Sequence, residues 1–214
     1  MNDIFMQSIK KTPLYKPLRN LLANRLYRNW EEDGKPIPPP NVLKQRVLRE
    51  YAQRYGTRIL IETGTFYGDM VEAMKVDFDH IYSVELSAEF YEKARSRFSK
   101  DTNIELIYGN SGTELHKIMD KINQAALFWL DGHYSGETTA LGEVTTPIYE
   151  ELQQIFDAED RRHVILIDDA RCFASDPAYP RIDDLFAFVK SRRSNVTITV
   201  LDDIIRIIPH EQTA

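Results

Sequence analysis

Ile61-Glu-Thr-Gly-Thr-Phe-Tyr-Gly68 joins the end of a short apolar run to the start of a segment with helical periodicity. Glycine at position 64 lets the backbone come close to a bound group, and the helix that follows offers its N-terminal amides to that group. Further along the chain, short apolar runs keep alternating with helical periods, which is typical of a parallel sheet with helices on both faces. The stretch therefore predicts the first strand-to-helix turn of an α/β domain.

The last two apolar runs break this rhythm. Residues 196–201 and 204–208 are separated only by Asp202 and Asp203, too few residues for a parallel crossover, so we expect an antiparallel hairpin. The predicted fold is a Rossmann-like, doubly wound sheet of seven strands, mostly parallel, that closes with this C-terminal hairpin. We expect the other strands at 58–62, 80–85, 104–108, 125–130 and 163–167, and helices at 42–55, 69–76, 88–98, 113–122, 147–157 and 182–191.

A proline-rich break, Gly34-Lys-Pro-Ile-Pro-Pro-Pro40, divides the chain, because consecutive prolines favour extended backbone. We expect a basic helical arm and linker over residues 1–40 and the main domain over residues 41–214. Residues 1–30 hold six basic side chains against one acidic one, and residues 14–30 have amphipathic helical periodicity. Packing on its own domain is the expected role of this helix. The alternatives are contact with a membrane surface, a cover over the site, and homo-oligomer formation.

Composition narrows the function classes. A net charge of −6 and a pI near 5.4 argue against a general nucleic-acid binder. No run approaches the ~20 apolar residues of a membrane span, so stable membrane insertion is not expected. The single cysteine, Cys172, excludes an internal disulfide and suits a reducing compartment, so the predicted location is cytoplasmic.

Three aspartates follow two of the predicted strands. Asp131 comes after residues 125–130, and Asp168 and Asp169 come after residues 163–167. Carboxylates that leave neighbouring parallel strands at the same edge can converge on one hard cation, and we predict a metal site here. Taken singly, each aspartate also fits an ordinary turn or helix-capping role, and the acids also suit contact with a cofactor or substrate.

The second and third strands end in polar residues at the same predicted edge. Glu85 stands about twenty residues after the glycine turn, where a ribose diol would need an acceptor, and Asn110 and Ser111 follow the third strand. With Glu-x-Gly-Thr-x-x-Gly after strand one and the terminal hairpin, residues 41–208 resemble the class I S-adenosylmethionine-dependent methyltransferases. The resemblance implies cofactor binding by Glu62, Gly64, Thr65, Gly68, Glu85, Asn110, Ser111 and Asp131.

Leu130-Asp-Gly-His-Tyr-Ser-Gly136 and Leu166-Ile-Asp-Asp-Ala170 are similar to the ends of strands four and five in metal-dependent O-methyltransferases of the catechol and macrocin types. This resemblance implies a Mg²⁺ ion held by Asp131, Asp168 and Asp169. His133 stands near the position of an acidic base in the sugar enzymes. We predict that it is the general base, and a role as a fourth ligand remains an alternative.

The predicted function is therefore S-adenosylmethionine-dependent O-methylation of a small polyhydroxylated acceptor, either sugar-like or catechol-like, with Mg²⁺ as a second cofactor. Two rival functions remain open. The same Asp131, His133, Asp168 and Asp169 are suited to a metal-dependent hydrolase, and the fold also serves as a non-catalytic nucleoside-binding module. The sequence names neither the acceptor nor the oligomeric state.

Overall fold

The computed structural model describes residues 15–132 and 146–210, and the chain divides into two compact units, residues 1–47 and 48–214. In the first unit, helix α2 (Tyr15–Glu32) is followed by the proline segment and the start of α3 (Asn41–Tyr55). The indole of Trp30 donates to the Pro36 carbonyl at 2.8 Å, and the Arg46 guanidinium lies over the Tyr27 ring at 3.9 Å. These two contacts fold the linker and the start of α3 back onto α2.

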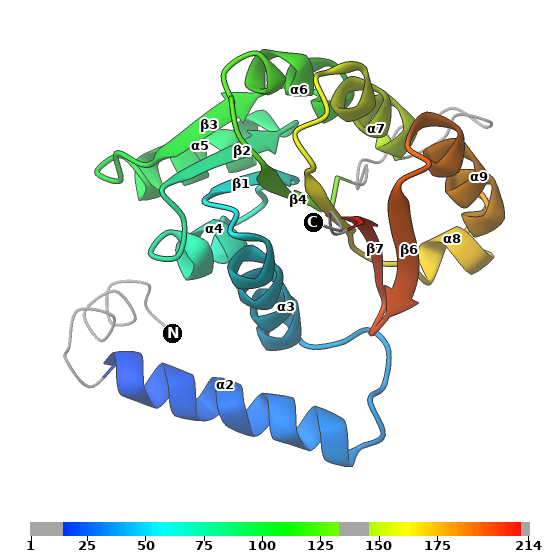
Figure 1. Ribbon diagram of the computed structural model, residues 1–214. Coiled ribbons are helices and arrows are strands. Elements are labelled where there is room, and N and C mark those ends of the chain that lie inside the picture. Colours follow the sequence, from blue (N-terminus) through cyan, green and yellow to red (C-terminus); the bar gives the residue numbers. More distant parts are fainter. Residues whose placement is uncertain (1–14, 133–145, 211–214) are drawn as a thin grey trace. The chain divides into compact units, whose positions relative to one another are not determined.

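The second unit is built on one sheet (Figure 1). In the part of the chain that the structure describes, seven strands form this sheet in the order β3-β2-β1-β4-β5-β7-β6. The first five strands along the chain are parallel, and β7 joins β5 antiparallel. The strands are β1 (Ile59–Thr63), β2 (His80–Glu85), β3 (Ile104–Tyr108), β4 (Ala126–Leu130), β5 (Val164–Ile167), β6 (Val196–Leu201) and β7 (Ile204–Pro209).

Helices cover both faces of the sheet because the chain reverses direction between β1 and β4. Right-handed crossovers place the helices that precede β2 and β3 on one face and those that precede β4 and β5 on the other. On the second face, side chains of α6, α7 and α9 pack with those of β1, β4, β5 and β7 into one apolar core. The remaining helices are α4 (Asp69–Met74), α5 (Ala88–Arg97), α6 (Ser111–Met119), α7 (Ile148–Asp157), α8 (Cys172–Ser175) and α9 (Ile182–Arg192).

The predicted fold is confirmed: a mostly parallel seven-stranded sheet closed by a hairpin, with ends within a few residues of those expected. Two of its predicted details differ. The short helix α8 was not predicted, because the segment Arg171-Cys-Phe-Ala-Ser175 is too short to show helical periodicity. Helix α6 begins at Ser111 rather than near residue 113, because the Asn110 side chain accepts from the Gly112 amide and caps the helix there. No helix in the described ranges is long and apolar enough to span a membrane.

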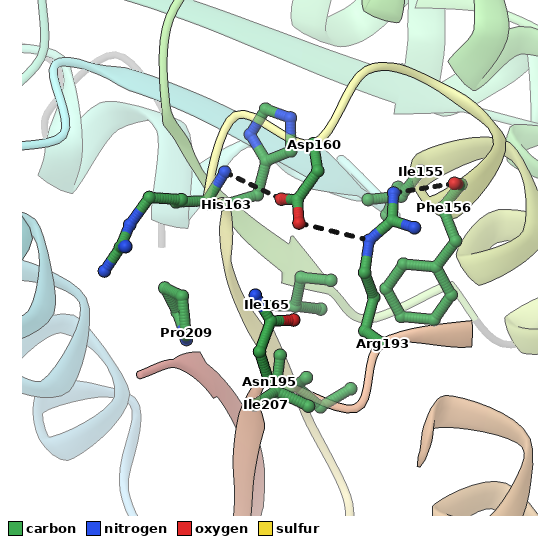
Figure 2. Close-up of a pocket in the computed structure, with 11 residues that line it drawn as sticks. Ile155, Phe156, Asp160, His163, Ile165, Arg193, Asn195, Ile207 and Pro209 are labelled. Atoms are coloured by element: carbon green, nitrogen blue, oxygen red, sulfur yellow. Dashed lines mark hydrogen bonds and ion pairs between the residues drawn. The ribbon is translucent and has the colours of Figure 1, made fainter. Parts of the chain in front are cut away.

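A small pocket lies at the amino end of β5, at the opposite end of the strand from the predicted site (Figure 2). Its wall includes His163, whose Nδ1 accepts from the Ala126 amide at 3.1 Å and whose ring meets the edge of Phe128 at 5.2 Å between centroids. Burial, with Arg161 and Arg193 nearby, lowers the pKa of His163 to about 4, although Asp160 opposes the shift. His163 is therefore a neutral core residue at pH 7.

We expect His163 to make the fold sensitive to acid. The unfolded chain takes up a proton at this histidine below about pH 6.5, whereas the folded chain resists protonation until about pH 4, so stability is lost as the pH falls between these values. The lowered pKa corresponds to roughly 3 kcal/mol. His163→Asn keeps an acceptor for the Ala126 amide and removes the titration. Urea unfolding at pH 7 and pH 4 should show a smaller loss of stability in the variant, and equal losses would contradict this prediction.

Candidate functional site

A pocket that is partly open to solvent lies at the carboxyl ends of β1, β2, β3 and β4. This is the point where the strand order reverses, and open α/β sheets bind their ligands at such a point. We call it the nucleoside pocket. Of the residues predicted to bind the cofactor, four line it, namely Gly64, Glu85, Asn110 and Ser111, together with Val84, Leu86, Gly109, Gly132 and Pro147.

Gly64 brings the ends of β1 and β4 into contact. Its φ is +85°, and a Cβ atom built on it would lie 2.7 Å from the carbonyl oxygen of Asp131. No side chain fits at that distance, and the left-handed conformation itself disfavours other residues. The Gly64 amide donates to the Val84 carbonyl at 2.9 Å, which fixes the turn against β2 as well. The sequence motif is therefore required by close backbone packing.

Glu85 forms one wall of the nucleoside pocket and is held on both oxygens. Its Oε2 accepts from the Phe66 amide at 2.7 Å, and its Oε1 accepts from the Ser87 amide at 2.8 Å. The residue is only 8% exposed. Each carboxylate oxygen keeps a second lone pair, so the group has acceptor capacity left for a ligand. Two amide donors fix the direction in which that capacity points.

Glu62 and Thr65 do not line the pocket but lie next to it in a buried polar chain. Ser83 Oγ is 2.5 Å from Glu62 Oε2 and 2.6 Å from Thr65 Oγ1. Burial raises the pKa of Glu62 to about 8, with the charges of Asp131 and Glu85 adding to the effect and the Ser83 hydrogen bond opposing it. Glu62 is thus a neutral acid at pH 7, and a direct cofactor contact by Glu62 or Thr65 stays a prediction.

Gly68 begins α4 with a φ of +75°, and a Cβ atom there would lie 2.6 Å from the ring of Phe98. Its place in the motif is explained by this packing of the turn on α5. A contact between Gly68 and the cofactor stays a prediction.

Sequence reasoning missed Glu151, on α7. Its side chain is 1% exposed, and its Oε1 accepts from the Ser111 hydroxyl at 2.5 Å. Burial raises the pKa of Glu151 to about 7, while hydrogen bonds from Ser111 and Thr63 oppose the shift. The signal was present: Ile148, Glu151 and Leu152 occupy the apolar stripe of an amphipathic helix, where an acid is unexpected.

A second pocket adjoins the first, and Gly132 lines both. We call it the acid pocket. The three predicted metal ligands, Asp131, Asp168 and Asp169, all lie on its wall. The full lining is Leu130, Asp131, Gly132, Thr146, Ile148, Glu151, Ile167, Asp168, Asp169, Phe173 and Tyr179.

The aspartate side chains of the acid pocket are not arranged as the ligands of a metal ion would be. Asp168 Oδ1 accepts from the Asp169 amide at 2.9 Å, and Asp169 Oδ1 accepts from Arg171 Nη1 at 2.9 Å. Within residues 15–132 and 146–210, no three His, Cys, Asp or Glu side chains form a group that would hold a metal ion. As they stand, the three aspartates do not fit the predicted Mg²⁺ ion. His133 lies outside the described residues, so its role as the base stays a prediction.

Comparison with known proteins tests the fold. No family model and no curated protein matches the chain. Among solved structures, the O-methyltransferase TomG from Streptomyces achromogenes, in complex with S-adenosylmethionine, has a TM-score of 0.57 at 17% identity over 88% of this chain and 89% of its own. The chain has the fold of the class I methyltransferases.

Two further solved structures share the methyltransferase fold. The O-methyltransferase from Bacillus cereus, bound to S-adenosylhomocysteine, has a TM-score of 0.56 at 15% identity, over 87% of this chain and 90% of its own. The Podospora anserina methyltransferase PaMTH1, also bound to S-adenosylhomocysteine, has a TM-score of 0.56 at 14% identity, over 94% of this chain and 97% of its own. The fold class predicted from the sequence is thereby confirmed.

Alanine substitutions at Gly64 and Gly56 should separate the cost of close packing from the cost of a left-handed backbone. Both glycines have a positive φ, but only Gly64 has a close neighbour at the Cβ position. Gly56 has a φ of +62° and nothing within 4 Å of a built Cβ. We expect Gly56→Ala to cost about 1–2 kcal/mol through its left-handed backbone alone. Gly64→Ala should cost about 1–3 kcal/mol more, since the new methyl group meets the Asp131 carbonyl. Denaturant unfolding measures both, and equal costs would contradict the packing role of Gly64.

Proposed function

We propose that this protein is an S-adenosylmethionine-dependent O-methyltransferase that acts on a hydroxyl of a small polyhydroxylated acceptor. The observation that supports this is the pair of adjoining pockets at the carboxyl edge of the sheet. One has a fixed carboxylate, Glu85, on its wall, and the other is lined by acids, with Gly132 common to both. Methyl transfer needs such an arrangement, because donor and acceptor must meet end to end.

In the nucleoside pocket, Glu85 is suited to accept hydrogen bonds from the two ribose hydroxyls. Its oxygens are already oriented by the Phe66 and Ser87 amides, so little ordering is required when a ligand binds. Asn110 and Ser111 border the place proposed for the adenine, and Leu86 supplies apolar surface there. The amino-acid end of the cofactor is proposed to lie along the Gly64 turn, which lines this pocket.

When bound, the cofactor supplies an electrophilic methyl group on a sulfonium centre. The acid pocket would hold the acceptor hydroxyl in line with that group, so that the new oxygen–carbon bond forms as the carbon–sulfur bond breaks. The hydroxyl proton passes to a base, for which His133 is proposed from the sequence. The acid pocket, as the described residues form it, does not fit the Mg²⁺ ion that the resemblance implies, and no step here depends on that ion.

Charge favours a neutral acceptor over nucleic acid. Asp131, Glu151, Asp168 and Asp169 all line the acid pocket, and the whole chain carries a net charge of −6. A phosphate backbone near these groups would be repelled, whereas sugar-like or catechol-like hydroxyls can donate to them. A cytoplasmic location and oligomer formation through residues 1–40 stay predictions from the sequence.

Titration calorimetry with S-adenosylhomocysteine tests the proposal. We expect the wild type to bind it and Glu85→Gln to bind at least about tenfold more weakly, because one charged acceptor for the ribose is lost. Glu105→Gln, on the neighbouring strand and outside the pocket, is the matched control and should bind like the wild type. A wild type that fails to bind the nucleoside would overturn the proposal.

Activity separates the enzyme from a binding module. Transfer of a labelled methyl group from S-adenosylmethionine to a panel of small sugars and catechols should give a product with an acid-stable methyl ether. Nucleoside binding without transfer to any member of the panel would favour the non-catalytic alternative.

A further inference from the structure

Arg171 joins two acidic groups that are far apart in the sequence. Its Nη1 donates to Asp169 Oδ1 at 2.9 Å and also to Asp203 Oδ2, and its backbone amide donates to Asp203 Oδ1 at 2.8 Å. Asp169 is on the wall of the acid pocket, whereas Asp203 belongs to the turn between β6 and β7. One guanidinium therefore links the predicted metal site to the terminal hairpin.

Asp203 anchors this guanidinium firmly. Its side chain is 1% exposed, and its backbone carbonyl accepts from the Ala170 amide at 2.9 Å. A buried carboxylate without a charged partner is costly, so Arg171 cannot swing away without leaving Asp203 uncompensated. The Arg171 side chain is itself partly exposed, at 37%, yet both of its carboxylate partners are more buried than it is. The guanidinium is therefore held by two carboxylates that lie deeper in the protein than it does.

We propose that Arg171 is the cation that pairs with Asp169 at the wall of the acid pocket and that, as long as Asp203 anchors it, it keeps a divalent ion from binding Asp169. The inference deepens the proposed function, because Asp169 lies on the wall of the pocket proposed for the acceptor hydroxyl. A divalent ion bound to Asp169 would lie within a few ångströms of the Arg171 guanidinium, and two cations that close repel each other. Arg171 and the ion therefore compete.

A purely structural ion pair makes a different prediction. If Arg171 only tied the hairpin to β5, its removal would lower stability and leave metal affinity unchanged. If it occupies Asp169 in place of an ion, its removal should raise metal affinity.

The test is a Mn²⁺ titration of the full chain, followed by calorimetry and by the Mn²⁺ electron paramagnetic resonance signal. Arg171→Gln with Asp203→Asn removes the guanidinium without leaving a buried charge, and the net charge stays the same. We expect this double variant to bind Mn²⁺ at least about tenfold more tightly than the wild type, because Asp169 is released. Adding Asp169→Asn should abolish the gain.

The matched control removes another arginine–aspartate pair, Arg58 and Asp79, whose side chains meet at 2.5 Å on the exposed surface. Arg58→Gln with Asp79→Asn should leave Mn²⁺ affinity at the wild-type level. Equal affinity in the wild type and in the Arg171 double variant, including no binding by either, would overturn the proposal. If the double variant does not fold, Mn²⁺ is titrated into Arg171→Gln alone. An affinity equal to that of the wild type would then overturn the proposal.

These titrations contain neither cofactor nor acceptor, so their outcome is separate from that of the proposed function. A protein that fails to bind S-adenosylhomocysteine but gains Mn²⁺ affinity on loss of Arg171 would retain the inference and lose the methyltransferase assignment. The reverse result would keep the methyltransferase and reject the role of Arg171.

Discussion

The close approach of Gly64 to the Asp131 carbonyl is the constraint on which the site depends. It sets the spacing between the ends of β1 and β4, and with it the wall that the two pockets share at Gly132. A side chain at position 64 would push these ends apart. Both the nucleoside pocket and the acid pocket would then lose their common boundary, whatever the residues that line them.

Crowding of acids around this boundary is tolerated because two of them, Glu62 and Glu151, are fully or partly protonated at pH 7. Burial raises the pKa of Glu62 to about 8 and that of Glu151 to about 7, so the first is neutral at pH 7 and the second partly so. Hydroxyls of Ser83 and Ser111 supply the hydrogen bonds that a buried carboxyl group needs. Protonation and hydroxyl partners together let acids stand close to the proposed ligand sites.

Patterns along the chain were enough to predict the sheet, since alternating periodicity and the two-residue break at Asp202 and Asp203 fix strand direction and the closing hairpin. They also placed three aspartates on one pocket. What they did not predict are pairings across long sequence distances. Arg171 meets Asp203 over 32 residues, and Glu151 meets Ser111 over 40, and neither spacing follows a local repeat. Such contacts exist only once the sheet order is formed.

The hairpin turn determines when, during synthesis of the chain, the contacts of the acid pocket can be completed. Asp202 and Asp203 both adopt positive φ, at 52° and 63°, a conformation that a two-residue hairpin requires but that costs energy in residues other than glycine. Until ribosomal synthesis passes this turn, Arg171 has no anchor and the edge of β5 has no neighbour on that side. A nascent chain halted before the hairpin would carry every aspartate of the acid pocket and still lack the carboxylate that anchors Arg171 beside Asp169.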